Sequence, residues 1–340
     1  MTVRDAIAAV ARRRSLTEAE MTSVVEGMMG GEASPAQIGA LLLGLRMKGE
    51  SADELCGAAR ALRRHAITIR PPPGIVVDTC GTGGDGRGTF NISTTAALIA
   101  AGAGVAVAKH GNRAMSGTVG GADVLEALGV NLDLEPAGLE DCLAEVGIAF
   151  LFASRLHPAM ARVAGLRREI GVRTIFNLVG PLANPAGVCH QVVGVFGSEW
   201  VRPMAAALAR LGTVRALVVH GRDGLDEITL ADATDAAEVR QGDVRELTIT
   251  PEQFHLPRCT ADELRVADVT EAAGAVRGVL AGERGPRRDV SLANAAAALY
   301  AAGRVESFAQ ATVLAAEAVD TGRARAVLDR LAQWSRGHRA

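Results

Sequence analysis

Residues 78–86 form a glycine-rich segment whose composition is typical of a phosphate-binding turn. They read Asp-Thr-Cys-Gly-Thr-Gly-Gly-Asp-Gly and follow the short apolar run of residues 75–77. A helix is predicted shortly afterwards, around residues 95–100. A glycine-rich turn between a strand and a helix presents free backbone N–H groups and the positive end of the helix dipole to an anion. We therefore expect this turn to bind a phosphate group.

Three polar side chains, Asn91, Ser93 and Thr94, lie where the predicted helix begins. Ser and Thr often do no more than cap a helix, and one hydroxyl is enough for that role. Three polar side chains beside a glycine-rich turn favour further ligands for an anion or a cation. Ser93 could both cap the helix and offer its oxygen to Mg²⁺, which prefers hard oxygen ligands.

A second polar segment, residues 109–117, follows the next predicted strand and reads Lys-His-Gly-Asn-Arg-Ala-Met-Ser-Gly. Taken alone, this composition is also that of an ordinary solvated loop. Its position after the second strand, beside the glycine-rich turn, favours a role in binding. Lys109 would supply a point charge and Arg113 a bidentate fork for phosphate oxygens.

Asp226 and Glu227 follow a later predicted strand, at the end of a segment that reads His-Gly-Arg-Asp-Gly-Leu-Asp-Glu. Adjacent acids on a loop are usually no more than soluble surface residues. Facing a phosphate-binding cleft, they would repel the ligand unless a divalent cation lay between them and the phosphates. These two residues are therefore candidate metal ligands, and Asp223 is a weaker one.

Residues 81–86 also match the Gly-x-Gly-x-x-Gly fingerprint of dinucleotide-binding proteins. That interpretation requires an acidic residue about 20 positions later, at the end of the next strand. The next predicted strand ends instead in the cationic segment that begins at Lys109. A dinucleotide site is therefore disfavoured, and a purely structural glycine turn is disfavoured further. The histidines show no His-x-x-x-His spacing, and no serine lies in a Gly-x-Ser-x-Gly turn.

The elements that must position these residues are helices first and then alternating strands and helices. Helix-start signatures at Thr17, Ser34 and Ser51 predict a helical unit over about the first 65 residues. Residues 70–74, Arg-Pro-Pro-Pro-Gly, predict a stiff connector. Apolar runs typical of strands follow at residues 75–78, 105–108, 148–152, 192–196 and 216–220. We predict an α/β fold, with a small all-helical N-terminal domain and a larger α/β domain around a mainly parallel central sheet.

Composition and charge exclude several classes of function. With 340 residues and a formal net charge of −2, the chain can build a substantial core but no broad basic surface. Neither nucleic acid nor a membrane is therefore an expected partner, and the longest uncharged run is interrupted by polar residues and glycine. The five cysteines never form a Cys-x-x-Cys pair, and the N-terminus lacks the apolar core of a signal peptide. These features predict reduced thiols, no zinc site and a cytoplasmic location.

Taken in order, these segments closely resemble the anthranilate phosphoribosyltransferases, a family of tryptophan biosynthesis. The resemblance covers nearly the whole chain, and the ordered set of motifs is specific although each motif alone is weak. The matching segments are Ser-Pro-Ala-Gln-Ile-Gly-Ala at 34–40, Gly-Thr-Gly-Gly-Asp at 81–85, Asn-x-Ser-Thr at 91–94, Lys-His-Gly-Asn-Arg at 109–113, Ala-Asp-Val-Leu-Glu-Ala-Leu-Gly at 122–129, Arg-Thr-Ile-Phe-Asn at 173–177, Gly-Pro-Leu-x-Asn-Pro-Ala at 180–186, Gly-Leu-Asp-Glu at 224–227 and Asn-Ala-Ala-Ala-Ala-Leu-Tyr at 294–300.

The resemblance implies transfer of the phosphoribosyl group of phosphoribosyl pyrophosphate to the amine of anthranilate. It also implies two domains, a helical one (residues 1–70 with a returning segment at about 159–186) and an α/β one (residues 71–158 and 187–340). A homodimer contacting through the helical domains is implied as well. Displacement of pyrophosphate develops charges that Mg²⁺, Lys109 and loop amides can stabilise without proton transfer. The lack of an obvious catalytic acid–base pair is therefore expected, and positioning of the substrates should contribute more.

The resemblance also implies a role for individual residues of this chain. Anthranilate would be contacted by Gly81, Asn112 and Arg167, and Mg²⁺, two ions per site, by Ser93, Asp226 and Glu227. The larger set, implied to bind phosphoribosyl pyrophosphate, consists of Gly81, Gly84, Asp85, Thr89, Asn91, Ile92, Ser93, Thr94, Lys109, His110, Gly111, Asn112, Arg113, Ala114, Met115, Ser116, Gly117 and Gly121.

The chain departs from the family pattern at residues 117–121, which read Gly-Thr-Val-Gly-Gly, whereas the family commonly has a sequence similar to Ser-Lys-Ser-Gly-Ser. A serine often assigned to phosphate binding falls at Gly121, so a contact there must come from the backbone. Val119 removes another hydroxyl, and an expected Asn is absent near Ala272. Two alternatives therefore stand beside the main one. A pyrimidine nucleoside phosphorylase has a related fold but would not need the Asp226 and Glu227 pair, and a donor-binding paralogue could have lost catalysis.

Overall fold

A seven-stranded sheet forms the centre of the protein within the residues that this computed structural model describes, 1–114 and 119–338. Its strand order is β3-β2-β1-β4-β5-β6-β7. The first five of these run parallel, whereas β6 and β7 pair antiparallel at one edge. The predicted mainly parallel sheet is confirmed. The strands are β1 (Val76–Gly81), β2 (Ala106–Gly111), β3 (Ile148–Phe152), β4 (His190–Gly194), β5 (Arg215–Gly221), β6 (Thr234–Arg240) and β7 (Asp243–Ile249).

The strands β1 and β2 reach further along the chain than their apolar runs predict. Gly81 pairs with Gly194, and Lys109 to Gly111 pair with Phe150 to Phe152. The expectation that Lys109, His110 and Gly111 belong to a loop is therefore wrong. Parallel pairing with β3 satisfies their backbone groups, and the strand fixes the direction in which Lys109 points.

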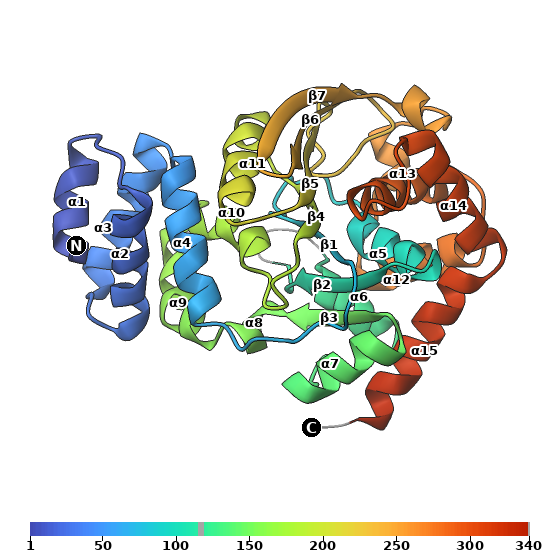
Figure 1. Cartoon of the computed structure of the whole chain (residues 1–340), viewed down its shortest axis with the longest axis horizontal. Coiled ribbons are helices and arrows are strands. Elements are labelled where there is room, and N and C mark those ends of the chain that lie inside the picture. Colours follow the sequence, from blue (N-terminus) through green and yellow to red (C-terminus); the bar gives the residue numbers. More distant parts are fainter. Residues whose placement is uncertain (115–118, 339–340) are drawn as a thin grey trace.

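Four helices begin the chain, at the left of Figure 1: α1 (Val3–Ala11), α2 (Glu18–Gly30), α3 (Pro35–Lys48) and α4 (Ala52–Arg64). The predicted capping boxes are confirmed, since Thr17, Ser34 and Ser51 each accept a hydrogen bond from the residue three positions on. The chain returns to these helices through α8 (Ala153–Leu156), α9 (Ala161–Ile170) and α10 (Ile175–Val179). There α9 contacts α3, and α10 contacts α3 and α4.

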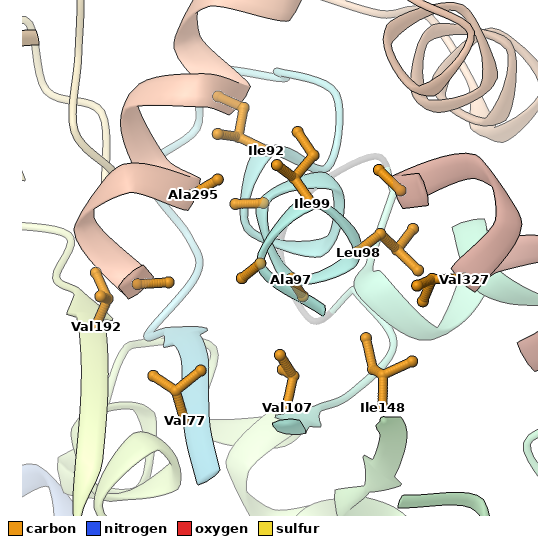
Figure 2. Packing of buried hydrophobic residues seen from close by; sticks show 14 of the residues in the cluster. Val77, Ile92, Ala97, Leu98, Ile99, Val107, Ile148, Val192, Ala295 and Val327 are labelled. Carbon is orange, nitrogen blue, oxygen red and sulfur yellow. The ribbon is translucent and has the colours of Figure 1, made fainter. Parts of the chain in front are cut away.

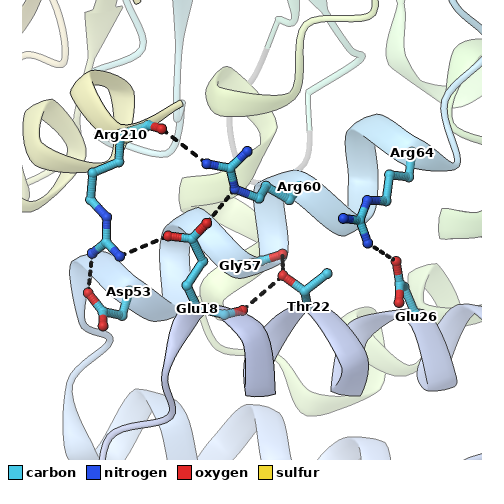
Figure 3. A network of polar contacts seen from close by, with 8 residues as sticks. All are labelled: Glu18, Thr22, Glu26, Asp53, Gly57, Arg60, Arg64 and Arg210. Atoms are coloured by element: carbon cyan, nitrogen blue, oxygen red, sulfur yellow. Dashed lines mark hydrogen bonds and ion pairs between the residues drawn. The ribbon is translucent and has the colours of Figure 1, made fainter. Parts of the chain in front are cut away.

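An ion-pair network joins the first helices to α11 (Val201–Arg210), which packs against β5 and β6 (Figure 3). Glu18 on α2 accepts a hydrogen bond from the Nη2 atom of Arg210 at 2.8 Å, and Arg60 on α4 pairs with the same carboxylate. The Arg60 guanidinium also donates to the carbonyl oxygen of Arg210 at 3.1 Å. Shared charges of this kind help to fix the helical unit on one side of the sheet.

The opposite side of the sheet is covered by α5 (Ile92–Gly102), which packs on β1, β2 and β3, and by a C-terminal helix, α13 (Pro286–Ala301), which packs on β1, β4 and β5 (Figure 2). Leu98 and Ile99 of this helix are fully buried, as are Val77 and Val107 beneath it. The remaining helices are α6 (Gly121–Ala127), α7 (Pro136–Glu145), α12 (Val269–Leu280), α14 (Phe308–Asp320) and α15 (Arg323–Gly337).

Five short 3₁₀ helices complete the described chain, and none of the described helices is long and apolar enough to cross a membrane. The 3₁₀ helices are Pro158–Met160, Gly180–Ala183, Ser198–Trp200, Pro251–Phe254 and Ala261–Leu264.

Candidate active site

The glycine-rich segment and the Asp226–Glu227 pair meet at the carboxyl ends of β1 and β4. A side chain added at Gly81 would place its Cβ 3.2 Å from Oδ2 of Asp226. A Cβ at Gly194, the last residue of β4, would lie 1.6 Å from the carbonyl oxygen of Asp226. Glycine at these two positions therefore lets the Asp226 backbone and carboxylate approach the sheet edge. The sequence reasoning missed Gly194, although an isolated glycine in a strand signals a close backbone approach.

Three carboxylates gather at this edge. The pKa of Asp226 is raised, first by burial and then by the nearby charges of Asp85 and Glu227. Burial also raises the pKa of Glu227, which the charge of Lys109 opposes. The Oδ2 atom of Asp85 is buried and has no hydrogen-bond partner within the described residues. Carboxylates in this situation favour a cation between them.

Glu227 also caps helix α5. Its Oε1 atom accepts a hydrogen bond from the backbone N–H of Ser93 at 3.2 Å. The expectation that Ser93 caps the helix is wrong, because the N-cap residue is Asn91 and makes no side-chain capping bond. The Ser93 hydroxyl is therefore available for other contacts. A negative group at a helix N-terminus is stabilised by the helix dipole, so Glu227 occupies part of the predicted anion site.

Lys109 lies at the floor of the site, with only 4% of its surface exposed. Its Nζ atom donates to the carbonyl oxygen of Thr79 and, at 3.2 Å, to the Ser93 hydroxyl. Burial lowers its pKa, and the charges of Asp78 and Glu227 act in the opposite direction. The cation is therefore held beside the carboxylate that caps α5.

A buried polar frame that sequence reasoning missed holds β2 against β1. Asp78 is fully buried and accepts hydrogen bonds from the His110 backbone N–H at 3.1 Å and from the Asn184 side chain at 2.8 Å. The His110 ring lies 5.2 Å from that of His157, and burial together with this neighbour lowers the pKa of His110 to about 3. His110 is therefore a neutral imidazole near pH 7.

Asn294 on α13 positions the segment that follows Glu227. Its side-chain Oδ1 accepts from the N–H of Ile228 at 3.0 Å, and its Nδ2 donates to the Ile228 carbonyl at 2.9 Å. A third hydrogen bond, to the Val290 carbonyl, fixes the amide within the helix. The motif that begins at Asn294 therefore supports the candidate metal ligands.

The second polar segment is closed by Asp123 of α6. One oxygen of this carboxylate accepts from the N–H groups of Ala114 at 3.2 Å and Gly120 at 2.9 Å. The other accepts from Arg113, which also pairs with Glu126. The Arg113 guanidinium is thus paired with the carboxylates of Asp123 and Glu126. Met115, Ser116 and Gly117 lie outside the described residues.

Each predicted binding segment also contacts a neighbouring part of the chain. Asn91 donates from Nδ2 to the Val119 carbonyl at 3.3 Å, while Asn112 accepts the Ser154 hydroxyl at 3.0 Å. Thr89 forms a bridge with Arg265, and Ile92 is buried at the start of α5. A Cβ on Gly121 would lie 3.3 Å from the Oγ1 atom of buried Thr94, so this position is tight for the serine of the family pattern.

Arg167 lies on α9, in the segment that returns to the helical unit. Burial lowers its pKa, and its guanidinium carbon lies 5.9 Å from the centroid of the Phe176 ring. It forms no ion pair with any residue that the structure describes. An arginine held on an aromatic ring without a carboxylate partner can bind an aromatic carboxylate.

The oxygen donors at the sheet edge fit Mg²⁺. No group of three or more His, Cys, Asp or Glu side chains closes around one point within residues 1–114 and 119–338. Mg²⁺ commonly takes only one or two protein carboxylates and completes its shell with water and substrate phosphates. The raised pKa values of Asp226 and Glu227 and the unpartnered oxygen of Asp85 are consistent with such a site.

Comparisons with known proteins match nearly the whole chain to one family. Residues 4–66 match the helical bundle domain of a glycosyl transferase family, and residues 73–325 match its a/b domain. An anthranilate phosphoribosyltransferase of Anaeromyxobacter sp. (strain K) is 54% identical over 329 residues, which cover 97% of each chain.

Solved structures agree with these matches. The crystal structure of anthranilate phosphoribosyltransferase from Thermus thermophilus has a TM-score of 0.92 and 44% identity, covering 98% of this chain and 99% of that one. The Saccharomyces cerevisiae enzyme, solved in complex with PRPP and Mg, has the same fold at 24% identity, with a TM-score of 0.89 and 98% coverage of each chain.

Proposed function

The chain belongs to the anthranilate phosphoribosyltransferase family, and from this premise we propose which of its residues perform each part of the reaction. The enzyme transfers the phosphoribosyl group of phosphoribosyl pyrophosphate to the amine of anthranilate. The products are N-(5-phosphoribosyl)anthranilate and pyrophosphate, and the reaction belongs to tryptophan biosynthesis. The observation that carries this function is the similarity to family members over 97% of both chains.

The donor is bound where the two loops and the N-terminus of α5 meet. The glycine-rich loop, from Gly81 to Asp85, would face the pyrophosphate together with Asn91 and Thr94, through those backbone amides that are not already bonded within the protein, as the Thr82 N–H is to the Gly194 carbonyl. The second loop, beyond His110 and Gly111, faces the phosphoribosyl part, with Gly121 contributing only backbone. This assignment is supported by the hydrogen bond from Asn91 to the Val119 carbonyl and by Asp123, which closes the second loop.

Asp226, Glu227 and the Ser93 hydroxyl would hold Mg²⁺, which when bound neutralises negative charge on the pyrophosphate. We propose two ions per site, which is the number that the family resemblance implies. The Saccharomyces cerevisiae enzyme was solved with PRPP and Mg, which supports the use of Mg²⁺ here, and the count of two is part of this proposal.

The reaction breaks the bond between the anomeric carbon and the pyrophosphate oxygen and forms one to the anthranilate nitrogen, which then loses a proton. Negative charge grows on the leaving oxygen, and the buried Lys109 ammonium and the loop amides stabilise it. Positioning supplies much of the remaining acceleration because the neutral aromatic amine is a weak nucleophile. The sheet edge provides this positioning by fixing Lys109 on a strand.

Arg167, Gly81 and Asn112 are proposed to bind the acceptor. Arg167→Ala is expected to raise the KM for anthranilate by about 10²-fold, because a bidentate charged contact is lost, while donor affinity changes little. Steady-state kinetics with each substrate varied would measure this. Arg168→Ala, an exposed neighbour on the same helix, is the matched control. A collapse of donor affinity in the Arg167 variant would contradict the assignment.

The function itself is tested by mixing the protein with anthranilate, phosphoribosyl pyrophosphate and Mg²⁺ and following the loss of anthranilate fluorescence. Folded protein that consumes no anthranilate at any Mg²⁺ concentration would contradict it. A parallel assay for phosphate-dependent release of uracil or thymine from nucleosides separates the nucleoside phosphorylase alternative. Calorimetry that detects donor binding without turnover would indicate the inactive paralogue.

We further propose a cytoplasmic homodimer that contacts through the helical unit. Leu43 and Met47 are 44% and 74% exposed and, four residues apart on α3, share one face of that helix. Replacing both by Glu is expected to convert dimers to monomers, as measured by sedimentation velocity. Val313→Glu is the control, because Val313 lies on α14 and is 66% exposed, and this change should leave the dimer intact. Wild-type protein that sediments as a monomer would overturn the proposal.

A further inference from the structure

Arg173 lies between the glycine-rich loop, which is proposed to bind the phosphoribosyl donor, and the segment that carries Arg167, which is proposed to bind anthranilate. It follows Gly171, the left-handed residue that ends α9, and precedes Thr174, the N-cap residue of α10. Its Nη2 atom donates a 2.6 Å hydrogen bond to the carbonyl oxygen of Gly84. Its guanidinium carbon also lies 4.3 Å from the centroid of the Phe196 ring. One exposed side chain thus touches both the glycine-rich loop and the chain just beyond β4.

The Phe196 ring is a fixed platform for this guanidinium. The Phe196 backbone N–H donates to the Thr82 hydroxyl at 3.1 Å, and the Thr82 N–H donates to the Gly194 carbonyl at 2.9 Å. The ring packs edge-on against the buried Trp200, with 6.2 Å between centroids. The glycine-rich loop is therefore tied to β4 at Thr82, and Arg173 adds a second anchor two residues later.

A second anchor matters because the loop has little order of its own. Gly83, Gly84, Gly86 and Gly88 all have positive φ angles, between 63° and 80°. Glycine loses more backbone entropy on ordering than any other residue, so such a loop needs contacts from outside to keep one conformation. A charged donor gives the Gly84 carbonyl a stronger hydrogen bond than a neutral one would.

We propose that Arg173 is a positioning residue that fixes the place of the glycine-rich loop relative to the acceptor-binding segment. This inference rests on the proposed function, in which Gly84 belongs to the donor site and Arg167 to the acceptor site. Arg167 precedes Arg173 by six positions, with α9 ending between them. Ordering the loop therefore also sets the distance between the two substrates, which governs the rate of a reaction that depends on positioning.

The test compares Arg173→Ala, Arg173→Lys and the control Arg168→Ala by kinetics and by hydrogen exchange. Arg173→Ala is expected to raise the KM for phosphoribosyl pyrophosphate and to lower kcat, each about tenfold, with a much smaller change in the KM for anthranilate. Amide exchange of residues 79–88 should become faster without any substrate. Arg173→Lys should recover part of both effects because an ammonium can still donate to Gly84, and Arg168→Ala should match the wild type.

Equal loop exchange and equal kinetics in Arg173→Ala and Arg168→Ala would overturn the inference. A rise in the KM for anthranilate alone would also overturn it, since that result indicates a direct acceptor contact. If Arg173→Ala fails to fold, Phe196→Leu, which removes the platform and retains the hydrogen bond, tests the same anchor. Amide exchange of the loop is measured without anthranilate. A wild-type protein without turnover would therefore refute the proposed function, while the exchange comparison would still test the role of Arg173.

Discussion

Replacing Asp226 and Glu227 together by Asn and Gln is expected to lower kcat/KM for phosphoribosyl pyrophosphate by about 10³-fold. Both side chains keep their shape, so the loss would come from the charges that hold Mg²⁺. The variant should also require more Mg²⁺ for half-maximal activity. Steady-state kinetics over a Mg²⁺ series, with metal binding followed by calorimetry in the presence of pyrophosphate, would measure both effects.

Asp232→Asn is the matched control for this substitution. Asp232 is an exposed acid in the same region, and its carboxylate accepts only the N–H of the residue that follows it among the described contacts. Its removal should leave the kinetics and the Mg²⁺ requirement unchanged. Wild-type metal affinity in the double variant would show that these acids are not the ligands.

The same pair should have the opposite effect on stability. Because the pKa values of Asp226 and Glu227 are raised in the fold, the folded protein binds more protons than the unfolded chain above the ordinary values of 3.8 and 4.5. Metal-free protein should therefore lose stability as the pH rises from these values through the raised pKa of Glu227, about 7, and Mg²⁺ should restore it. Urea unfolding of the double variant in EDTA should show no such loss, which separates impaired catalysis from impaired folding.

Lys109→Met is expected to lower kcat by about 10²-fold and the free energy of unfolding by about 2 kcal/mol. The substitution removes the ammonium that contacts Thr79 and Ser93 while retaining an apolar stem of similar length. The loss of the charge acts on the leaving group, and the loss of the hydrogen bonds acts on the fold. Single-turnover kinetics and urea unfolding would measure the two effects separately.

The chain's only other lysine offers a matched control. The side chain of Lys48 is also buried and pairs with the buried Glu54 at 2.9 Å, in the helical unit. Lys48→Met should therefore cost comparable or greater stability while kcat stays near the wild-type value. If both variants lose the same fraction of kcat, the effect of Lys109 is structural.

Much of the fold was predictable because its signals are local. The capping residues Thr17, Ser34 and Ser51 accept hydrogen bonds from backbone N–H groups three positions away. The apolar runs of the strands are recognisable from their own residues. The ends of β1 and β2 were not predictable in this way. Their last residues are polar or glycine and are strand only because Gly194 and Phe152 lie opposite them.

The sequence pointed to candidate site residues but not to the contacts between them. Glycine, acidic and cationic residues at the ends of strands pointed to phosphate and a metal ion. Ser93 was expected to cap α5, whereas Glu227 caps this helix, and the ion pair of Arg113 with Asp123 had no local signal. Asp78 and Asn184 lie in segments that the sequence marked, but their pairing was not predictable, because a buried carboxylate or amide looks the same in a sequence as an exposed one.

The amino-acid sequence by itself determined the glycine-rich turn, the helix starts, the strand runs and the ordered motifs that identify the family. Each of these depends on residues within a few positions of one another, where backbone preference and hydrogen bonding act directly. Only the tertiary structure decided the partners, since Glu227 meets Ser93 across 134 positions and Arg173 meets Gly84 across 89. Such contacts have no local periodicity. The first exists because parallel strands bring their carboxyl ends to one edge of the sheet, and the second because the segment between α9 and α10 lies against the glycine-rich loop.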